Sequence, residues 1–223
     1  MSKHLMVELD KLKRKLLEVS SLVEQNVSKS VRAVVEGDDE LAREVIAKDQ
    51  DIDTMEVEVE EECLKVLALY QPVANDLRFV VVTLKINNDL ERIGDLAVNI
   101  AERALFLAKN DPVVWPEDFD TMSIKTRQML KNALDALVNM DVALAHQVCL
   151  MDDDVDAINR QMYQHVYSRI KKDPERVEIY TNFVSVSKHL ERIADYATNI
   201  SMDVIYMIEG TIIRHHRDDL VGS

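Results

Sequence analysis

The sequence predicts an all-α protein built as two tandem three-helix bundles, and three observations lead to this prediction. Apolar residues recur at the spacing of a buried helix face over almost the whole chain. Only four glycines and four prolines are present in 223 residues, and most stand where one helix would end and another begin. Residues 90–100 match residues 190–200 at eight of eleven positions, which indicates a duplicated unit of about half the chain.

The first half is expected to contain three helices. The first runs from about residue 3 to 36, and Gly37 ends it because glycine readily adopts the left-handed conformation that follows many helices. Asp38 or Asp39 then caps a second helix, which Pro72 ends near residue 70. The third helix runs from about residue 73 to 110, so we assign residues 1–110 to the first bundle.

The second half repeats this plan after a segment at 111–116 that contains two prolines. A helix is expected from about 117 to 140, a second from 142 to 171 with Asp141 as its cap, and a third from about 175 to 209 after Pro174. Residues 117–210 therefore form the second bundle, and residues 211–223 are predicted to be a polar C-terminal tail.

Composition narrows the classes of function. The net charge of −14 disfavours nucleic acid as a partner, because phosphate backbones are bound by concentrated lysine and arginine. Neither a secretory signal nor an apolar run long enough to span a membrane is present, which predicts a cytoplasmic protein that meets a membrane only through a partner. Cys63 and Cys149 form no paired motif and are expected to be small apolar residues in a reducing compartment.

The duplicated stretch retains polar residues as well as apolar ones. An acid, a second acid and an asparagine recur four residues apart, so they lie along one slowly turning stripe of a helix. The asparagines either add a carbonyl ligand or bond across helices, and the arginine that follows the first acid either pairs locally or holds a partner. These positions are Glu91, Arg92, Asp95 and Asn99 in the first copy and Glu191, Arg192, Asp195 and Asn199 in the second.

Acids of the preceding helix should lie at the same height, because two helices joined by a tight turn are antiparallel. Asp49 lies 23 residues before Pro72 and Asp95 lies 23 residues after it. The second half shows the same coincidence around Asp173 to within one residue. Each half is thus predicted to gather four carboxylates: Asp49, Asp53, Glu91 and Asp95 in the first, and Asp152, Asp156, Glu191 and Asp195 in the second.

Crowded carboxylates repel one another, and either protons or a cation relieves the repulsion. Oxygen ligands suit hard or borderline cations such as Mg, Mn, Ca or iron, and suit copper or structural zinc poorly. The metals considered are iron, Mn, Mg, Ca or Zn, with identity and nuclearity open. The alternative is that these acids form only the solvated face that amphipathic helices need. Two facing stripes, each present twice, favour metal sites.

Two further classes compete with a regulatory metal-binding protein. Di-iron oxidases of the helical-bundle type use Glu-x-x-His pairs, and the sequence contains none. A carboxylate-bridged metalloenzyme resembling a phosphohydrolase stays open, although no glycine-rich phosphate loop is visible. A purely structural helical scaffold is the third reading. We assign no catalytic residue and expect a protein that is not an enzyme.

The chain resembles the PhoU family of accessory regulators of bacterial phosphate uptake. The resemblance is carried by residues 72–78 and by the two copies of Leu-Glu-Arg-Ile-Gly/Ala-Asp at 90–95 and 190–195, and it spans essentially the whole chain. The family's Glu/Asp-x-x-x-Asp signature is met in each of the four acidic pairs named above. In the second copy Ala194 replaces Gly94, and no Asp-Leu-Arg follows Pro174, but neither departure removes a ligand.

This resemblance implies a metal-binding adaptor between a phosphate ABC transporter, through its ATPase subunit, and a sensor histidine kinase. Such proteins act as negative regulators of phosphate uptake and phosphate-starvation signalling. The resemblance also implies multinuclear metal clusters on the bundle surface and a homodimer. The docking surface, and whether phosphate binds directly, stay open.

Overall fold

The computed structural model describes residues 3–110, 114–116 and 118–210, which form six long α-helices and one short 3-10 helix without any strand. The all-α prediction is confirmed, and every helix begins and ends within three residues of its predicted bounds. The predicted tail at 211–223 lies outside the described residues. The elements are α1 (Lys3–Glu36), α2 (Asp39–Tyr70), α3 (Ala74–Leu107), α4 (Asp118–Asn139), α5 (Val142–Lys172), η1 (Pro174–Arg176) and α6 (Val177–Glu209).

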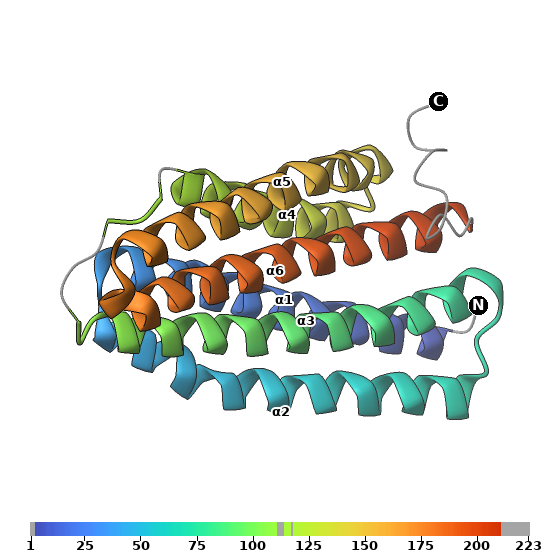
Figure 1. Cartoon of the computed structure of the whole chain (residues 1–223). Helices are drawn as coiled ribbons and strands as arrows, with labels where there is room; N and C mark the ends of the chain where they lie inside the picture. Colours follow the sequence, from blue (N-terminus) through green and yellow to red (C-terminus); the bar gives the residue numbers. More distant parts are fainter. Residues whose placement is uncertain (1–2, 111–113, 117, 211–223) are drawn as a thin grey trace.

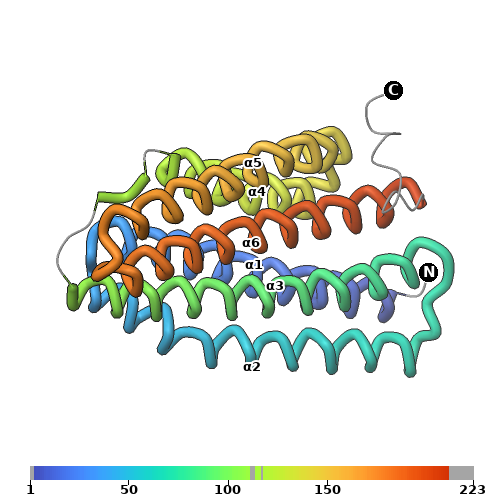
Figure 2. The backbone as a smooth tube through the Cα atoms, viewed as in Figure 1, coloured from blue at the N-terminus to red at the C-terminus, as the bar shows by residue number. Residues whose placement is uncertain are grey.

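The helices run antiparallel to their neighbours in sequence and form two three-helix groups, α1–α3 and α4–α6 (Figure 1). Helices α3 and α6 lie side by side in the middle, while α2 and α5 occupy opposite edges of the molecule (Figure 2). Packing of α3 on α6, and a smaller contact of α1 with α4, join the groups into one body. Whether the two groups fold as separate domains stays a prediction.

The helix boundaries follow the predicted signals. Gly37 adopts φ +67°, and the Asp38 carboxylate then accepts a hydrogen bond of 2.9 Å from the backbone N–H of Leu41. The second bundle repeats this cap, since Asp141 accepts a hydrogen bond of 3.0 Å from Leu144 N–H. The expected caps are therefore present at both equivalent positions.

Apolar side chains of all six helices form one continuous core, and corresponding positions of the repeat are buried alike. Leu90 and Leu190, for example, are both completely buried. Cys63 lies in this core and Cys149 is half-buried, and neither forms a disulfide. None of the described helices combines the length and the apolar character needed to cross a bilayer.

Polar groups are concentrated where α3 packs against α6. Lys85 Nζ lies 3.4 Å from Oδ1 of Asp203, whose side chain is only 2% exposed. Near the other end of this interface, Ser185 Oγ and His189 Nε2 lie 3.2 Å apart, within hydrogen-bond distance. Burial, together with the positive charges of Arg103, Arg192 and Lys188, lowers the pKa of His189 to about 4. The bundles are thus joined partly through polar contacts.

Candidate functional site

The first acidic site, defined by Asp49, Asp53, Glu91 and Asp95, lies between α2 and α3. The two helices approach closely here, because a Cβ added at Gly94 would stand 3.4 Å from Ile52 and 3.7 Å from Asp49 Oδ1. Asp49 is therefore level with Gly94 and the adjacent Asp95. Repeated spacing of four residues places Asp53 and Glu91 one turn away on their respective helices.

These carboxylates act on one another. Burial and then the negative charges of Asp53 and Asp95 raise the pKa of Asp49. Burial also raises the pKa of Glu91, reinforced by Asp95, Glu56 and Asp53. Four acids from two helices thus share one electrostatic environment, which makes the metal-free site repulsive.

Two further acids extend the first site beyond the residues assigned from the sequence. Burial and the charges of Glu60 and Asp53 raise the pKa of Glu56. The Asn87 side chain, completely buried on α3, donates hydrogen bonds to the Glu56 backbone oxygen at 2.9 Å and to Glu56 Oε1 at 3.2 Å. Glu56 and Glu60 continue the acidic stripe of α2, so the same helical spacing that picked out Asp53 would have found them.

The second acidic site, defined by Asp152, Asp156, Glu191 and Asp195, lies between α5 and α6. Asp152 is 2% exposed, whereas Asp195 is exposed. Burial and the charges of Asp156 and Asp152 raise the pKa of Glu191. Asp152 and Asp156 of α5 therefore lie near Glu191 of α6, and Asp195 lies one turn further along α6.

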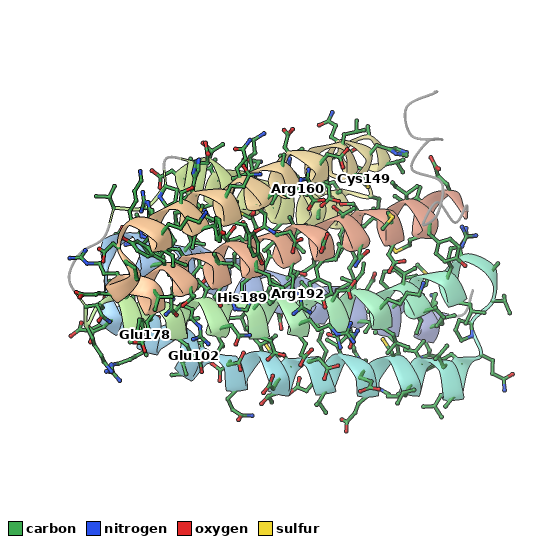
Figure 3. All side chains as sticks on the ribbon, viewed as in Figure 1. Glu102, Cys149, Arg160, Glu178, His189 and Arg192 are labelled. Atoms are coloured by element: carbon green, nitrogen blue, oxygen red, sulfur yellow. The ribbon has the colours of Figure 1, made fainter. Side chains whose placement is uncertain are left out.

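Basic side chains border the second site more closely than the first. Arg160 Nη1 lies 3.7 Å from Asp156 Oδ2. Lys188 and Arg192 both oppose the rise in the pKa of Glu191, whereas only Arg92 opposes the rise in that of Glu91. Figure 3 shows Arg160 on α5 and Arg192 on α6. The two repeated arginines, Arg92 and Arg192, are exposed and lie beside the acids.

The donor set fits hard cations, because all eight predicted ligands are carboxylates. Asn87 Oδ1, buried near Glu56, has no hydrogen-bond partner among the described residues and is a further oxygen donor. Across the described part of the chain, however, no three acidic, histidine or cysteine side chains converge closely enough to hold an ion. Binding therefore requires side-chain rotation, which half-buried and exposed carboxylates allow.

A separate pocket of about 220 Å³ lies where α1, α3, α4 and α6 meet. Its lining is mainly apolar and includes Leu16, Phe79, Leu137 and Met207, and none of the eight predicted ligands contributes to it. The pocket is therefore distinct from both acidic sites.

Comparison with known proteins agrees with this geometry. The family described as "PhoU domain" matches residues 16–104 and 119–204, one copy in each bundle. A "Phosphate-specific transport system accessory protein PhoU homolog" from Aquifex aeolicus is 36% identical over 208 residues, covering 93% of this chain and 94% of that protein. The homolog of the same description from Clostridium acetobutylicum is 36% identical over 206 residues, covering 91% and 93%.

Two crystal structures share the fold. PhoU from Pseudomonas aeruginosa superposes with a TM-score of 0.90 at 34% identity, covering 92% of this chain and 99% of that one. The phosphate transport system regulatory protein PhoU from Streptococcus pneumoniae gives a TM-score of 0.86 at 29% identity, covering 93% and 98%. The similarity thus extends over both bundles.

Proposed function

The chain belongs to the PhoU family, and from this we propose that it is an accessory protein of phosphate transport that acts as a cation-binding adaptor and not as an enzyme. The carrying observation is the family match, which covers both bundles, together with an acidic site in each. Relatives that match over nearly their full length are described as accessory proteins of a phosphate-specific transport system.

The adaptor links the ATPase subunit of a phosphate ABC transporter to a sensor histidine kinase in the cytoplasm. It restrains both uptake and phosphate-starvation signalling when phosphate is plentiful. A homodimer is the assembly that we propose for it. Long helices with acids displayed beside exposed arginines suit a protein that works by docking, since they offer charged surface at a fixed spacing.

Each acidic site holds cations through its four carboxylates. A bound cation supplies the positive charge that relieves their mutual repulsion. Neutralising the acids leaves the neighbouring bases as the dominant charge, Arg92 at the first site and Arg192 with Arg160 and Lys188 at the second. The electrostatic surface presented to a partner therefore changes with occupancy. This is how metal binding would be coupled to docking.

Elemental analysis of protein purified without chelator tests the metal assignment. Asp95→Asn together with Asp195→Asn should lower the metal content of both halves, and because both residues are exposed the fold should tolerate the change. Asp51→Asn is the matched control, since this exposed acid pairs with Lys48 on α2 and lies outside the predicted ligand set. Full metal content in the double variant, at unchanged stability, would refute the ligand assignment.

Deletion in cells tests the regulatory role. Phosphate-starvation genes should stay switched on in phosphate-rich medium when the protein is missing. Normal repression in the deleted strain would contradict the adaptor function. A phosphoesterase activity of the purified protein that Asp95→Asn abolishes would instead establish the metalloenzyme alternative.

A further inference from the structure

The two acidic sites occupy equivalent positions but have unequal surroundings. Residues of α2 correspond to residues of α5 at an offset of 103, and residues of α3 correspond to those of α6 at an offset of 100. All four predicted ligands of each site are preserved at these offsets. Several of their neighbours are not, and at positions 56, 57, 60 and 88 the second bundle has lost a negative charge or gained a positive one.

In the first site the additional neighbours are acidic. Glu56 and Glu60 follow Asp53 at successive turns of α2. The charge of Glu60 acts on Glu56, and the charge of Glu56 acts on Glu91. Position 57, which corresponds to Arg160 of the second bundle, is an exposed valine. Buried Asn87 is fixed to Glu56 through two hydrogen bonds and leaves its Oδ1 without a hydrogen-bond partner among the described residues. The first site thus combines six acids with one nearby base, Arg92.

In the second site the corresponding neighbours are neutral or basic. Asn159 replaces Glu56 and accepts a hydrogen bond of 2.7 Å from Ser187, which replaces Asn87. Tyr163 replaces Glu60. The local bases are Arg160, Lys188 and Arg192, so four acids here face three bases.

We propose that the first acidic site is a high-affinity cation site and the second a low-affinity one, with Arg160 as the residue that weakens the second. This inference rests on the proposed cation-binding function. Local negative charge attracts a divalent cation, and the first site has both more acids and fewer bases. In the second site a cation has to displace the Arg160 guanidinium from Asp156, so binding there is opposed by the loss of an existing ion pair.

Unequal affinity creates a range of cation concentration in which only the first bundle is loaded. Within that range Arg92 stands beside neutralised carboxylates while Arg192 still stands beside charged ones. The protein then has three charge states: neither site loaded, only the first site loaded, and both sites loaded. A partner that contacts both bundles can distinguish them.

Titration of the full chain with Mn²⁺, after removal of bound metal, tests the inference by calorimetry. We expect two phases whose dissociation constants differ by about tenfold or more. Asp95→Asn should weaken the tighter phase and Asp195→Asn the weaker one. Arg160→Gln should strengthen the weaker phase several-fold, whereas Glu56→Gln with Glu60→Gln should weaken the tighter phase.

Arg176→Gln is the matched control, because this arginine of the second bundle also pairs with an aspartate, Asp173 at 3.6 Å, but lies outside the acidic site. It should leave both phases unchanged. Absence of any Mn²⁺ binding would defeat the proposed function itself. Mn²⁺ binding with equal affinity in both bundles, assignment of the tighter phase to the second site, or an Arg160→Gln variant that titrates like the parent would overturn only this inference.

Discussion

Beside the first acidic site, Asn87 of α3 donates a hydrogen bond to Glu56 of α2. Beside the second site, Ser187 of α6 donates a hydrogen bond to Asn159 of α5. A hydrogen bond between helices is retained at the same place, but the acid is replaced by an amide. Burial requires these groups to be paired and does not require them to be charged. The charge beside each site could therefore change between the two repeats while the hydrogen bond between the helices was kept.

The largest effect is expected from truncating side chains in the apolar core that the two bundles share. Leu90→Ala and Leu190→Ala truncate equivalent, completely buried side chains, and each should lower the free energy of unfolding by about 3 kcal/mol. Because α3 packs on α6, we expect one cooperative transition in calorimetry for both variants. Two separated transitions would instead show that the bundles unfold independently.

A smaller effect, on the pH dependence of stability, is expected at a position where the repeats differ. His189 of the second bundle corresponds to Asp89 of the first. The folded-state pKa of His189 is about 4, so between pH 6.5 and 4 the unfolded chain binds a proton that the folded chain does not. The contribution of this group to stability is therefore present above pH 6.5 and is lost on acidification, by about 2 kcal/mol for a half-buried ring.

Denaturant unfolding across this pH range measures the contribution. His189→Asn should lose about 2 kcal/mol less than the parent between pH 7 and 4. The raised pKa values of Glu91 and Glu191 act in the opposite direction in both proteins and cancel from the difference. Parallel stability curves for the two proteins would contradict the buried, neutral histidine.

The caps should respond equally in the two bundles. Asp38→Ala and Asp141→Ala each remove one side-chain hydrogen bond to a helix N-terminus, which costs about 1 kcal/mol. Thermal unfolding midpoints measure both variants under the same conditions. A difference of more than about 1 kcal/mol between them would show that the caps are not equivalent despite their matching geometry.

The smallest effect is expected from removing one glutamate charge from each acidic site, and it should differ between the two sites. In chelator at pH 7.5, Glu91→Gln should stabilise the protein by about 0.5 kcal/mol, because it removes a charge from a crowded and partly exposed cluster. Glu191→Gln should have less effect, because Lys188 and Arg192 already offset the repulsion there. The difference should shrink on acidification, because the raised pKa values of Glu91 and Glu191 favour their protonated, uncharged forms. Equal stabilisation at pH 7.5 would show that the sites are electrostatically alike.

Local signals were sufficient to predict the helices, since Gly37, Asp38 and Asp141 act within one turn of their own position. The pairing of acids in each site also followed from the sequence, because a tight turn fixes the register of the two helices that it joins. Contacts between α3 and α6 were not predictable in this way. Lys85 and Asp203 meet across 118 residues with no turn to set their register.

Glu56 was not among the ligands assigned from the sequence, because sequence spacing reports direction on a helix and not depth. Its side chain is half-buried and accepts a hydrogen bond from Asn87 of the neighbouring helix. The metal assignment itself stays a prediction.

Helices α2 and α5 each contribute two of the four predicted ligands of their own site and lie at the edges of the molecule (Figure 2). In α2, six of 32 residues are buried, against 14 of 34 in α3. Edge helices with little buried surface open more readily than central ones and exchange their amide hydrogens sooner. Each opening withdraws two of the four carboxylates at once. At the proposed cation sites we therefore expect the detachment of the edge helix to limit how long a cation stays bound. Conditions that slow amide exchange in α2 and α5 should then also slow cation release.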